Sequence, residues 1–478
     1  MERLSGTDSG FLAMDQEWQP MHNVVLAVLA AHPERAPVTR EQLRDHVVAR
    51  LDDLPRYRQR IVEVPGGWHH PLAVDDPDFD PERHVIHLDG AEVAAHGASV
   101  DEVFAALAEV PLPLDRPLWR MYLLDSPGPG FAGIEPGGCA VVLHFHHAIG
   151  DGAALMATLP RLFDDVGAPR LAEVPAYHPR ALPSQFWLRA AALWHLLVSF
   201  VAFLAAVLGA VGGLRRLRAR QEVAVVEVPP ISHGAPRSLF NEAFSPRRAC
   251  VRVALPLEGL KQVRTQTGHT LNDVVLAVVS GGLRDYLAQM DALPEEPLLC
   301  NVPVSEEGAD APVRTSGNNF WSLTTSLATD VADPLERLAR IGEVTQECKI
   351  QLAEFGVTTI PTLLDTVPPR LLARGTRRVG ERLRTADRVD ANVLVSNVRG
   401  NPDPFWLFGR EVTSLWVCGP PSNGVGLNIS VMSYAGRLHL TVLACADALS
   451  DPQRLADALG ATYLALVDEV GTAGAASA

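Results

Sequence analysis

One stretch of the chain passes from an apolar run through a polar turn into a helical pattern. Ala140–Phe145 is largely apolar and β-branched, which predicts a strand buried on both faces. Glycines on either side of Asp151 indicate a tight turn, and Ala153–Phe163 has apolar residues at helical spacing. His146 and His147 therefore lie where a buried strand ends and a helix begins, a place where layered α/β folds often carry chemistry.

The two histidines are expected to have different surroundings. Adjacent residues of a strand point to opposite faces, so one histidine would face a cavity and the other would be packed. The alternative is a pair of core histidines followed by Asp151 as the N-cap of the next helix. We favour the first interpretation because the histidines, the turn and the helix occur together.

The first half alternates between predicted strands and helices. Residues 4–11 predict a turn-rich lead-in to a strand at Asn23–Ala31. Helical spacing of apolar residues predicts helices at Glu41–Leu51 and Val100–Val110.

Two further strands are expected to pair across a loop rich in glycine and proline, at 118–124 and 139–146. Trp119 in the first of them is interpreted as an aromatic anchor of the core. Basic residues on alternating positions indicate the solvated side of a strand, at Arg56, Arg58 and Arg60.

Composition narrows the class of protein. The chain has 478 residues, is 47% hydrophobic and 20% charged, and carries a net charge of −15, which indicates a globular protein and disfavours a nucleic-acid partner. Its six cysteines are scattered without a Cys-x-x-Cys pair, which fits a reduced cytosolic setting and gives no support to a metal site. No basic segment followed by an apolar core opens the sequence, so no secretory signal is expected.

Residues 146–152 read His-His-Ala-Ile-Gly-Asp-Gly. The pattern His-His-x-x-x-Asp-Gly resembles the signature of the CoA-dependent acyltransferase superfamily. That superfamily includes chloramphenicol acetyltransferase, peptide-synthetase condensation domains and the bacterial wax ester synthase/diacylglycerol acyltransferases.

Other segments resemble the wax ester synthase/diacylglycerol acyltransferase family in particular, and together they extend the resemblance over nearly the whole chain. They are Leu4–Phe11, Asp75–Asp80, Pro117–Arg120, Asn272–Asp273, Val302–Ser305, Gly317–Phe320, Val395–Val398 and Tyr434–Leu438.

The resemblance implies an α/β (α+β layered) fold of two chloramphenicol-acetyltransferase-like domains. Each would be a mixed sheet flanked by helices, with the active-site channel between them. We expect the His-His motif in a domain at 1–180, an apolar helical linker at 181–235, and a second domain at 236–478.

Acyl transfer from a thioester to an alcohol needs a base for the attacking hydroxyl, and a histidine with a pKa near 6.5 suits this role. The sequence has no Gly-x-Ser-x-Gly elbow and no cysteine beside the histidines, so a covalent acyl-enzyme is not expected. The resemblance implies direct transfer with acyl-CoA as co-substrate, no permanently bound cofactor, and His147 as the base, with His146 beside it.

Other site residues follow from the same resemblance. Asp151 is implied to hold the turn through an ion pair whose partner the sequence does not assign, and Gly152 allows close backbone approach. Asn272 and Asp273 are candidates for substrate binding, with Asn272 polarising or positioning the reacting carbonyl. Capping of the helix that follows Thr270 would also account for this segment.

Two segments depart from the family pattern. Glu306–Glu307 stands where the family tends to have a basic residue, and Arg399–Asn401 stands where it tends to have a proline-containing turn. Both departures leave the substrate preference open.

Residues 190–214 contain His195 as their one ionisable side chain and are followed by four arginines. A helix of this length would reach roughly 37 Å, enough to cross a bilayer. Spanning would place the two halves on opposite sides of the membrane, so we favour a linker helix that lies on the membrane, dips into it, or packs against the protein.

A second segment suggests a surface for an anionic partner. Pro368–Pro369 suits a helix start, and arginines recur every four residues along one side of the helix, at Arg370, Arg374, Arg378 and Arg382. A solvated face, an anionic membrane and the phosphates of CoA are the three interpretations. We predict membrane docking by this helix together with the apolar residues 190–214, because a basic face and an apolar segment supply the two signals that stable attachment needs.

The function expected from the resemblance is O-acylation of diacylglycerol or a long-chain alcohol by acyl-CoA. The alternatives are a condensation-type transferase that uses carrier-protein thioesters and a catalytically weak lipid-droplet protein. We expect a cytoplasmic location at the inner face of the membrane or on lipid droplets, and a homodimer is left open.

Overall fold

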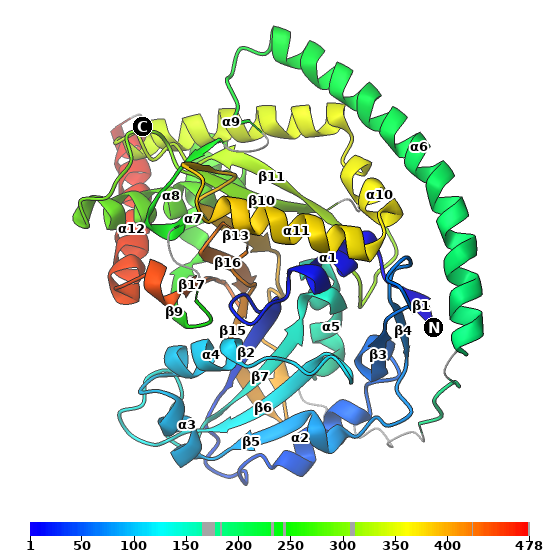
Figure 1. Cartoon of the computed structure of the whole chain (residues 1–478). Coiled ribbons are helices and arrows are strands. Elements are labelled where there is room, and N and C mark those ends of the chain that lie inside the picture. Colours follow the sequence, from blue (N-terminus) through cyan, green and yellow to red (C-terminus); the bar gives the residue numbers. More distant parts are fainter. Residues whose placement is uncertain are drawn as a thin grey trace.

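The computed structural model describes residues 1–164, 177–181, 184–230, 234–241, 245–305, 311–422 and 424–476. Two six-stranded mixed sheets form its centre, and helices cover their outer faces (Figure 1). The expected α/β fold of two helix-flanked sheets is confirmed.

The first sheet contains strands from both ends of the chain. In spatial order they are β14 (Trp406–Leu407), β15 (Arg410–Cys418), β2 (His22–Leu29), β7 (Cys139–His146), β6 (Trp119–Asp125) and β5 (Val85–Leu88).

The second sheet is built from the C-terminal half. Its order is β11 (Phe320–Ser326), β10 (Leu299–Ser305), β13 (Val393–Val398), β16 (Leu427–Tyr434), β17 (Arg437–Cys445) and β9 (Arg248–Pro256). Two smaller sheets are β1 (Glu2–Arg3), β4 (Leu72–Asp75) and β3 (Gln59–Val62), and β12 (Arg388–Val389) with β8 (Ala235–Pro236).

The first half of the chain forms the helices α1 (Gly6–Met14), α2 (Arg40–Val48), α3 (Gly90–His96), α4 (Val100–Glu109) and α5 (Gly152–Leu162), followed by the connecting helix α6 (Gln185–Val223). Those of the second half are α7 (Leu257–Thr267), α8 (Leu271–Gln289), α9 (Pro334–Phe355), α10 (Thr359–Thr366), α11 (Pro369–Leu383) and α12 (Pro452–Ala476).

The two strands expected to pair across the glycine-rich loop do so. β6 and β7 are antiparallel, with Trp119 opposite Phe145. Trp119 is 1% exposed, and its indole N–H donates to the Tyr57 carbonyl at 2.7 Å, so it anchors the core as expected.

Two expectations for the first half were wrong. Residues 6–14 form α1 instead of a turn, because Ser5 and Asp8 make a reciprocal capping box at its start. Arg56 and Arg58 lie in a buried 3₁₀ turn, where they pair with Glu2 and Asp52, instead of on the solvated side of a strand.

Residues 406–418 lie in the range expected for the second domain, but their strands belong to the first sheet. Strands β14 and β15 follow the second sheet's strands in the chain but complete the first sheet, with β15 antiparallel to β2. The first sheet therefore depends on two strands that a cut between 180 and 236 would place in the other piece, whereas all six strands of the second sheet lie after that cut.

The apolar linker is a single helix, α6, that runs along one side of the molecule (Figure 1). By length and composition it could cross a membrane. It packs on α10 and α9, so it is not detached from the protein.

Candidate active site

The turn after β7 positions the two histidines differently. β7 ends at His146, residues His147–Ile149 make a 3₁₀ turn, and α5 begins at Gly152. Asp151 is the N-cap of α5 and accepts a hydrogen bond from the Ala154 amide at 3.0 Å.

His146 is fully buried behind the turn. Its Nδ1 accepts a hydrogen bond from the Ala148 amide at 2.9 Å, and its Nε2 lies 3.6 Å from a carboxylate oxygen of Asp15. These contacts position the turn and leave this imidazole without access to the cavity described below.

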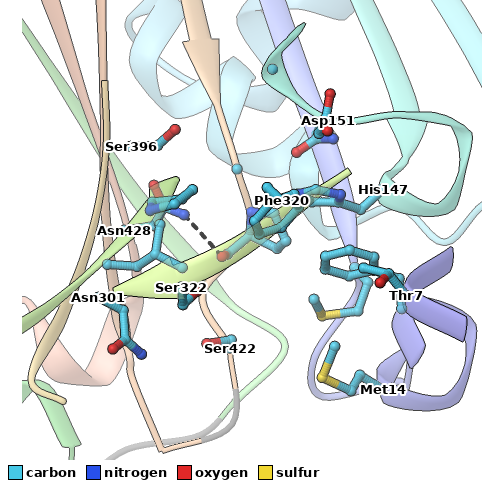
Figure 2. Close-up of a pocket in the computed structure, with 18 of the residues that line it drawn as sticks. Thr7, Met14, His147, Asp151, Asn301, Phe320, Ser322, Ser396, Ser422 and Asn428 are labelled. Carbon is cyan, nitrogen blue, oxygen red and sulfur yellow. Dashed lines mark hydrogen bonds between the residues drawn. The ribbon is translucent and has the colours of Figure 1, made fainter. Parts of the chain in front are cut away.

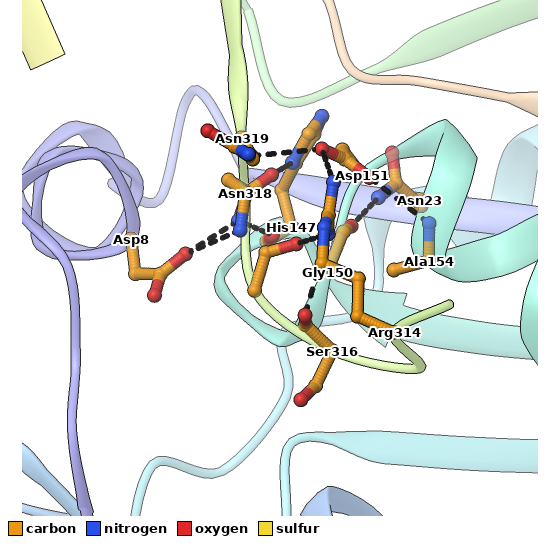
Figure 3. A network of polar contacts seen from close by, with 11 residues as sticks. Asp8, Asn23, His147, Gly150, Asp151, Ala154, Arg314, Ser316, Asn318 and Asn319 are labelled. Atoms are coloured by element: carbon orange, nitrogen blue, oxygen red, sulfur yellow. Dashed lines mark hydrogen bonds and ion pairs between the residues drawn. The ribbon is translucent and has the colours of Figure 1, made fainter. Parts of the chain in front are cut away.

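His147 lines that cavity. Its imidazole stacks on the Phe11 ring, with centroids 3.9 Å apart and 11° between the planes. Its Nδ1 lies 3.0 Å from the side-chain oxygen of Asn318, which is in the β10–β11 connection of the second sheet, just before β11 (Figure 3).

The contacts of Asn318 determine which nitrogen of His147 carries a proton. The Asn318 Nδ2 group donates to Asp8 Oδ1 and to the His147 carbonyl, each at 2.8 Å, and so uses both of its hydrogens. The Asn318 oxygen must therefore face Nδ1 of His147 and can only accept. Neutral His147 is thus protonated on Nδ1 and has a free lone pair on Nε2.

Burial lowers the pKa of His147 to about 4, and the nearby Asp151 carboxylate and the Asn318 oxygen oppose this only in part. The imidazole is therefore neutral at pH 7. Asp8, which orients Asn318, is itself buried, and burial raises its pKa although hydrogen bonds with Asn318 and Ser5 and the charge of Arg56 act against this.

Arg314 is the ion-pair partner that the sequence did not assign to Asp151. Its Nη2 lies 2.6 Å from Asp151 Oδ2, and the Asn319 amide donates to the same oxygen at 2.9 Å (Figure 3). Both partners come from the second half of the chain, so the turn that carries His147 is held from across the interface.

Gly152 lies against β13. A Cβ atom at this position would be 2.9 Å from Cγ2 of Val398, closer than a side chain can approach without displacing its neighbour. The close approach expected for Gly152 is therefore present, and it is made to Val398.

The cavity lies between the two sheets and has a volume of about 350 Å³. Its apolar lining comes mainly from Phe11, Met14, Met21, Leu155, Phe320, Leu364, Leu372, Leu394 and Val398. Figure 2 shows Asn301, Ser322, Ser396 and Asn428 together on the side away from His147 and Thr7. Cys418 also contributes to the lining, but burial raises the pKa of its thiol well above the usual range. This thiol stays protonated and is a poor nucleophile.

Neither Asn272 nor Asp273 lines this cavity. Asp273 forms a capping box with Thr270 at the start of α8, and the Asn272 oxygen accepts a hydrogen bond from Asn397 at 3.3 Å. The cap accounts for Asp273, whereas a substrate contact of Asn272 stays a prediction.

Sequence reasoning missed several residues of this site, chiefly Phe11, Asp8, Asn318 and Arg314. Asn318 lies in a segment that resembles the family, but no local pattern assigns it a role. Glu306–Glu307, one of the departures from the family pattern, falls outside the described residues. The described part of the chain contains no group of three histidine, cysteine or acidic residues suited to a metal ion.

The two-sheet fold and the His-His turn define a two-domain acyltransferase of the chloramphenicol acetyltransferase type. The structure is similar to wax ester synthase/diacylglycerol acyltransferase from Marinobacter aquaeolei, with a TM-score of 0.64 and 23% identity over 98% of this chain and 100% of that one. It also resembles trichothecene 15-O-acetyltransferase from Fusarium sporotrichioides, with a TM-score of 0.58 and 13% identity over 97% of this chain and 94% of the other. Both similarities concern the fold.

Residues 4–275 match the wax ester synthase/diacylglycerol acyltransferase catalytic domain, and residues 316–466 match the C-terminal domain of the same family. The chain therefore belongs to this family of acyltransferases. A Mycobacterium tuberculosis protein named as a diacylglycerol O-acyltransferase is 29% identical, over 97% of this chain and 96% of its own length. Another from that organism is 30% identical, over 96% of this chain and 88% of its own length.

Proposed function

We propose that this enzyme transfers a long-chain acyl group from acyl-CoA to the hydroxyl of diacylglycerol or a long-chain alcohol, with His147 as general base. The observation that carries the proposal is the Asn318 contact, which leaves Nε2 of His147 as an unprotonated base in an apolar cavity. The names of the relatives support the choice of substrates.

In the proposed reaction, Nε2 of His147 takes the proton of the acceptor hydroxyl as its oxygen attacks the thioester carbonyl. The tetrahedral intermediate collapses with cleavage of the carbon–sulfur bond. The CoA sulfur takes the proton from His147, so the products are an ester and free CoA thiol. During these steps the Asn318 oxygen accepts from Nδ1–H and stabilises the imidazolium, while Asp8 holds the Asn318 amide in place.

Direct transfer, without a covalent acyl-enzyme, is supported by the side chains that could act as a nucleophile in the cavity wall. Burial raises the pKa of the Cys418 thiol, and this thiol donates a hydrogen bond to the Gly419 carbonyl at 3.3 Å. Within the described residues, the hydrogen-bond partner of the His147 side chain is Asn318, and neither a cysteine thiol nor a serine hydroxyl contacts it in this way. An activated nucleophile would need such a contact with a base.

The decisive experiment uses purified protein with palmitoyl-CoA and either dioleoylglycerol or hexadecanol, followed by release of free thiol. His147→Ala should lower kcat by at least roughly 10²-fold, the lower range for loss of a general base, with an unchanged melting temperature. His147→Gln is the matched control, because it keeps a polar side chain without a base of suitable pKa. Near-normal turnover in His147→Ala would overturn the assignment of the base.

We further propose that α6 attaches the enzyme to a membrane or lipid-droplet surface on the cytoplasmic side. Several large apolar side chains of α6 are 64% to 84% exposed: Phe186, Leu193, Trp194, Leu197, Phe200, Val201 and Leu208. Exposed apolar surface of this size marks an interaction with lipid or protein.

Both ends of α6 are fixed to the protein, which favours a helix that lies along the surface over one that spans it. Near the start, Leu188 and Ala192 pack against Val64 and neighbouring residues of the small sheet. Near the end, Arg220 pairs with Glu347 of α9, and a Cβ at Gly213 would be 2.2 Å from the Phe355 carbonyl oxygen. A spanning helix would have to give up one set of contacts.

A further inference from the structure

The cavity that holds His147 has two chemically different walls. The wall contributed by α1, α10 and α11 is mainly apolar, with Phe11, Met14, Leu364 and Leu372, and its polar side chains are the hydroxyls of Thr7 and Thr376. The second sheet contributes Asn301 on β10, Ser322 on β11 and Ser396 on β13, which Figure 2 shows away from Met14 and Thr7. We call Asn301, Ser322 and Ser396 the polar strip.

The polar strip belongs to one face of three neighbouring strands. β10 lies between β11 and β13, and Asn301 is opposite Thr324 of β11 and Leu394 of β13. The residues next in sequence, Val302, Leu323 and Val395, point the other way and are buried among apolar side chains. The polar residues are thus confined to the face that borders the cavity.

The polar strip has hydrogen-bonding capacity that the protein does not use. The Asn301 oxygen accepts from the Thr324 hydroxyl at 2.8 Å, but within the described residues its Nδ2 group has no partner. The hydroxyls of Ser322 and Ser396 likewise have none in the part of the chain that the structure describes.

Other polar residues of the same wall are satisfied by the protein. Asn428 donates to the Pro420 carbonyl at 3.0 Å and accepts from the Ser430 hydroxyl at 2.9 Å. The Gly419 amide donates to that hydroxyl at 3.1 Å. The contrast indicates that the strip's free donors are directed at a ligand and are not needed by the fold.

The ligand group that meets the strip is neutral. Among the described residues that line the cavity, Asp151 is the one acidic or basic side chain apart from His147, and it is paired with Arg314. A plain long-chain alcohol has one polar atom, which must go to His147. Its methylene groups would then cover the polar strip and leave the donors there without water or any other hydrogen-bond partner, which costs binding free energy.

We propose that the polar strip binds a second, neutral hydrogen-bonding group of the acyl acceptor, of the kind that an acylglycerol ester carbonyl provides. The strip thereby makes the enzyme prefer acylglycerol-like acceptors to plain long-chain alcohols. This inference rests on the proposed function, because it requires the acceptor hydroxyl to be at His147.

The test compares dioleoylglycerol and hexadecanol as acceptors of palmitoyl groups from palmitoyl-CoA. In the double variant Ser322→Ala/Ser396→Ala, the ratio of kcat/KM for dioleoylglycerol to that for hexadecanol should fall roughly 10-fold or more, as expected for loss of two hydrogen bonds. The KM for palmitoyl-CoA should not change. Ser322→Thr/Ser396→Thr is the matched control, since it keeps both hydroxyls and should retain most of the ratio.

Two outcomes would overturn the assignment while leaving the proposed function intact. One is an unchanged ratio in an active double variant. The other is a higher KM for palmitoyl-CoA with both acceptors alike, which would assign the strip to the amides of the CoA arm. Failure of the wild-type protein to acylate either acceptor would instead refute the proposed function itself.

Discussion

The Asp151 carboxylate and the Arg314 guanidinium, 163 residues apart in the chain, form an ion pair with 2.6 Å between Oδ2 and Nη2. The same carboxylate caps α5 and accepts from the Asn319 amide. One side chain therefore connects the turn of His147, the helix that follows it and the opposite half of the molecule.

We expect Asp151→Ala to lower both stability and turnover. Loss of the cap and of a mostly buried ion pair should reduce the free energy of unfolding by roughly 2–3 kcal/mol, which urea denaturation would measure. Arg314→Leu keeps the cap, so it should be less damaging, and the double variant should cost less than the sum of the two. Unchanged denaturation with lost turnover would instead indicate a direct chemical role for Asp151.

Asn318→Ala should lower kcat on the order of 10²-fold with little change in KM, because Nδ1 of His147 would lose the acceptor that fixes its tautomer. Asn318→Asp should raise the pKa of His147 by placing a negative charge beside Nδ1. The acid limb of the pH profile of kcat/KM should then move to higher pH than in the wild type, where burial lowers the pKa to about 4. An unmoved limb would contradict the positioning role.

Gly152→Ala should reduce activity and cost about 1 kcal/mol or more of stability, as overpacking does in a filled interior, because its Cβ would be 2.9 Å from Val398. Val398→Ala removes the obstructing methyl groups, so the double variant should recover part of both losses. Thermal melting and turnover of the two single variants and the double variant would check this. No recovery would mean that Gly152 is needed for its backbone and not for the space beside it.

The protein should lose stability in mild acid. Burial lowers the pKa of His144 to about 3 and that of His22 well below its usual value. The unfolded chain therefore binds more protons than the folded protein as the pH falls below about 6.5, and the free energy of unfolding decreases through this window. Each such histidine should cost on the order of 1–2 kcal/mol between pH 7 and pH 5. Urea denaturation at the two pH values would show it, and His144→Phe should reduce the difference.

The basic face of α11 should contribute to membrane attachment. Arg370 is not available for this contact, because its guanidinium lies over the Trp68 ring, 4.1 Å from the ring centroid. Arg374, Arg377 and Arg378 of the same helix are exposed. Reversal of these three arginines to glutamate should weaken sedimentation with anionic liposomes and make the remaining binding less sensitive to salt.

The control for the liposome experiment reverses three basic residues on α7 and α12, namely Lys261, Arg264 and Arg454, and so changes the net charge equally. This control should bind liposomes nearly as the wild type does. If liposome binding were unaffected in the α11 variant while the KM for acyl-CoA rose sharply, the stripe would serve the phosphates of CoA instead.

Local features of the sequence predicted local structure well. The apolar residues before His146 form strand β7, and Thr270 caps α8 as expected. The different surroundings expected for His146 and His147 are also observed, although His147 lies in the 3₁₀ turn that follows β7 and not in the strand itself. Each of these predictions depends on neighbours within a few residues.

The residues that complete the site could not be found in this way. Asn318 and Arg314 reach the His147 turn from the second half of the chain, so no spacing in the sequence connects them to it. Arg56 was misassigned for the same reason, because its partner Glu2 is 54 residues away. The sheet to which β15 belongs was also not predictable, since an apolar alternating strand suits either sheet.

The placement of β15 has a consequence for how the protein is made. Until residues 410–418 leave the ribosome, the edge of β2 that faces away from β7 has no partner strand. All eight residues of β2 are buried in the finished protein. Exposed apolar edges of this kind promote association with other chains. The first sheet therefore closes only after most of the polypeptide has been synthesised, and a nascent chain that stalls before residue 410 would depend on chaperones to stay soluble.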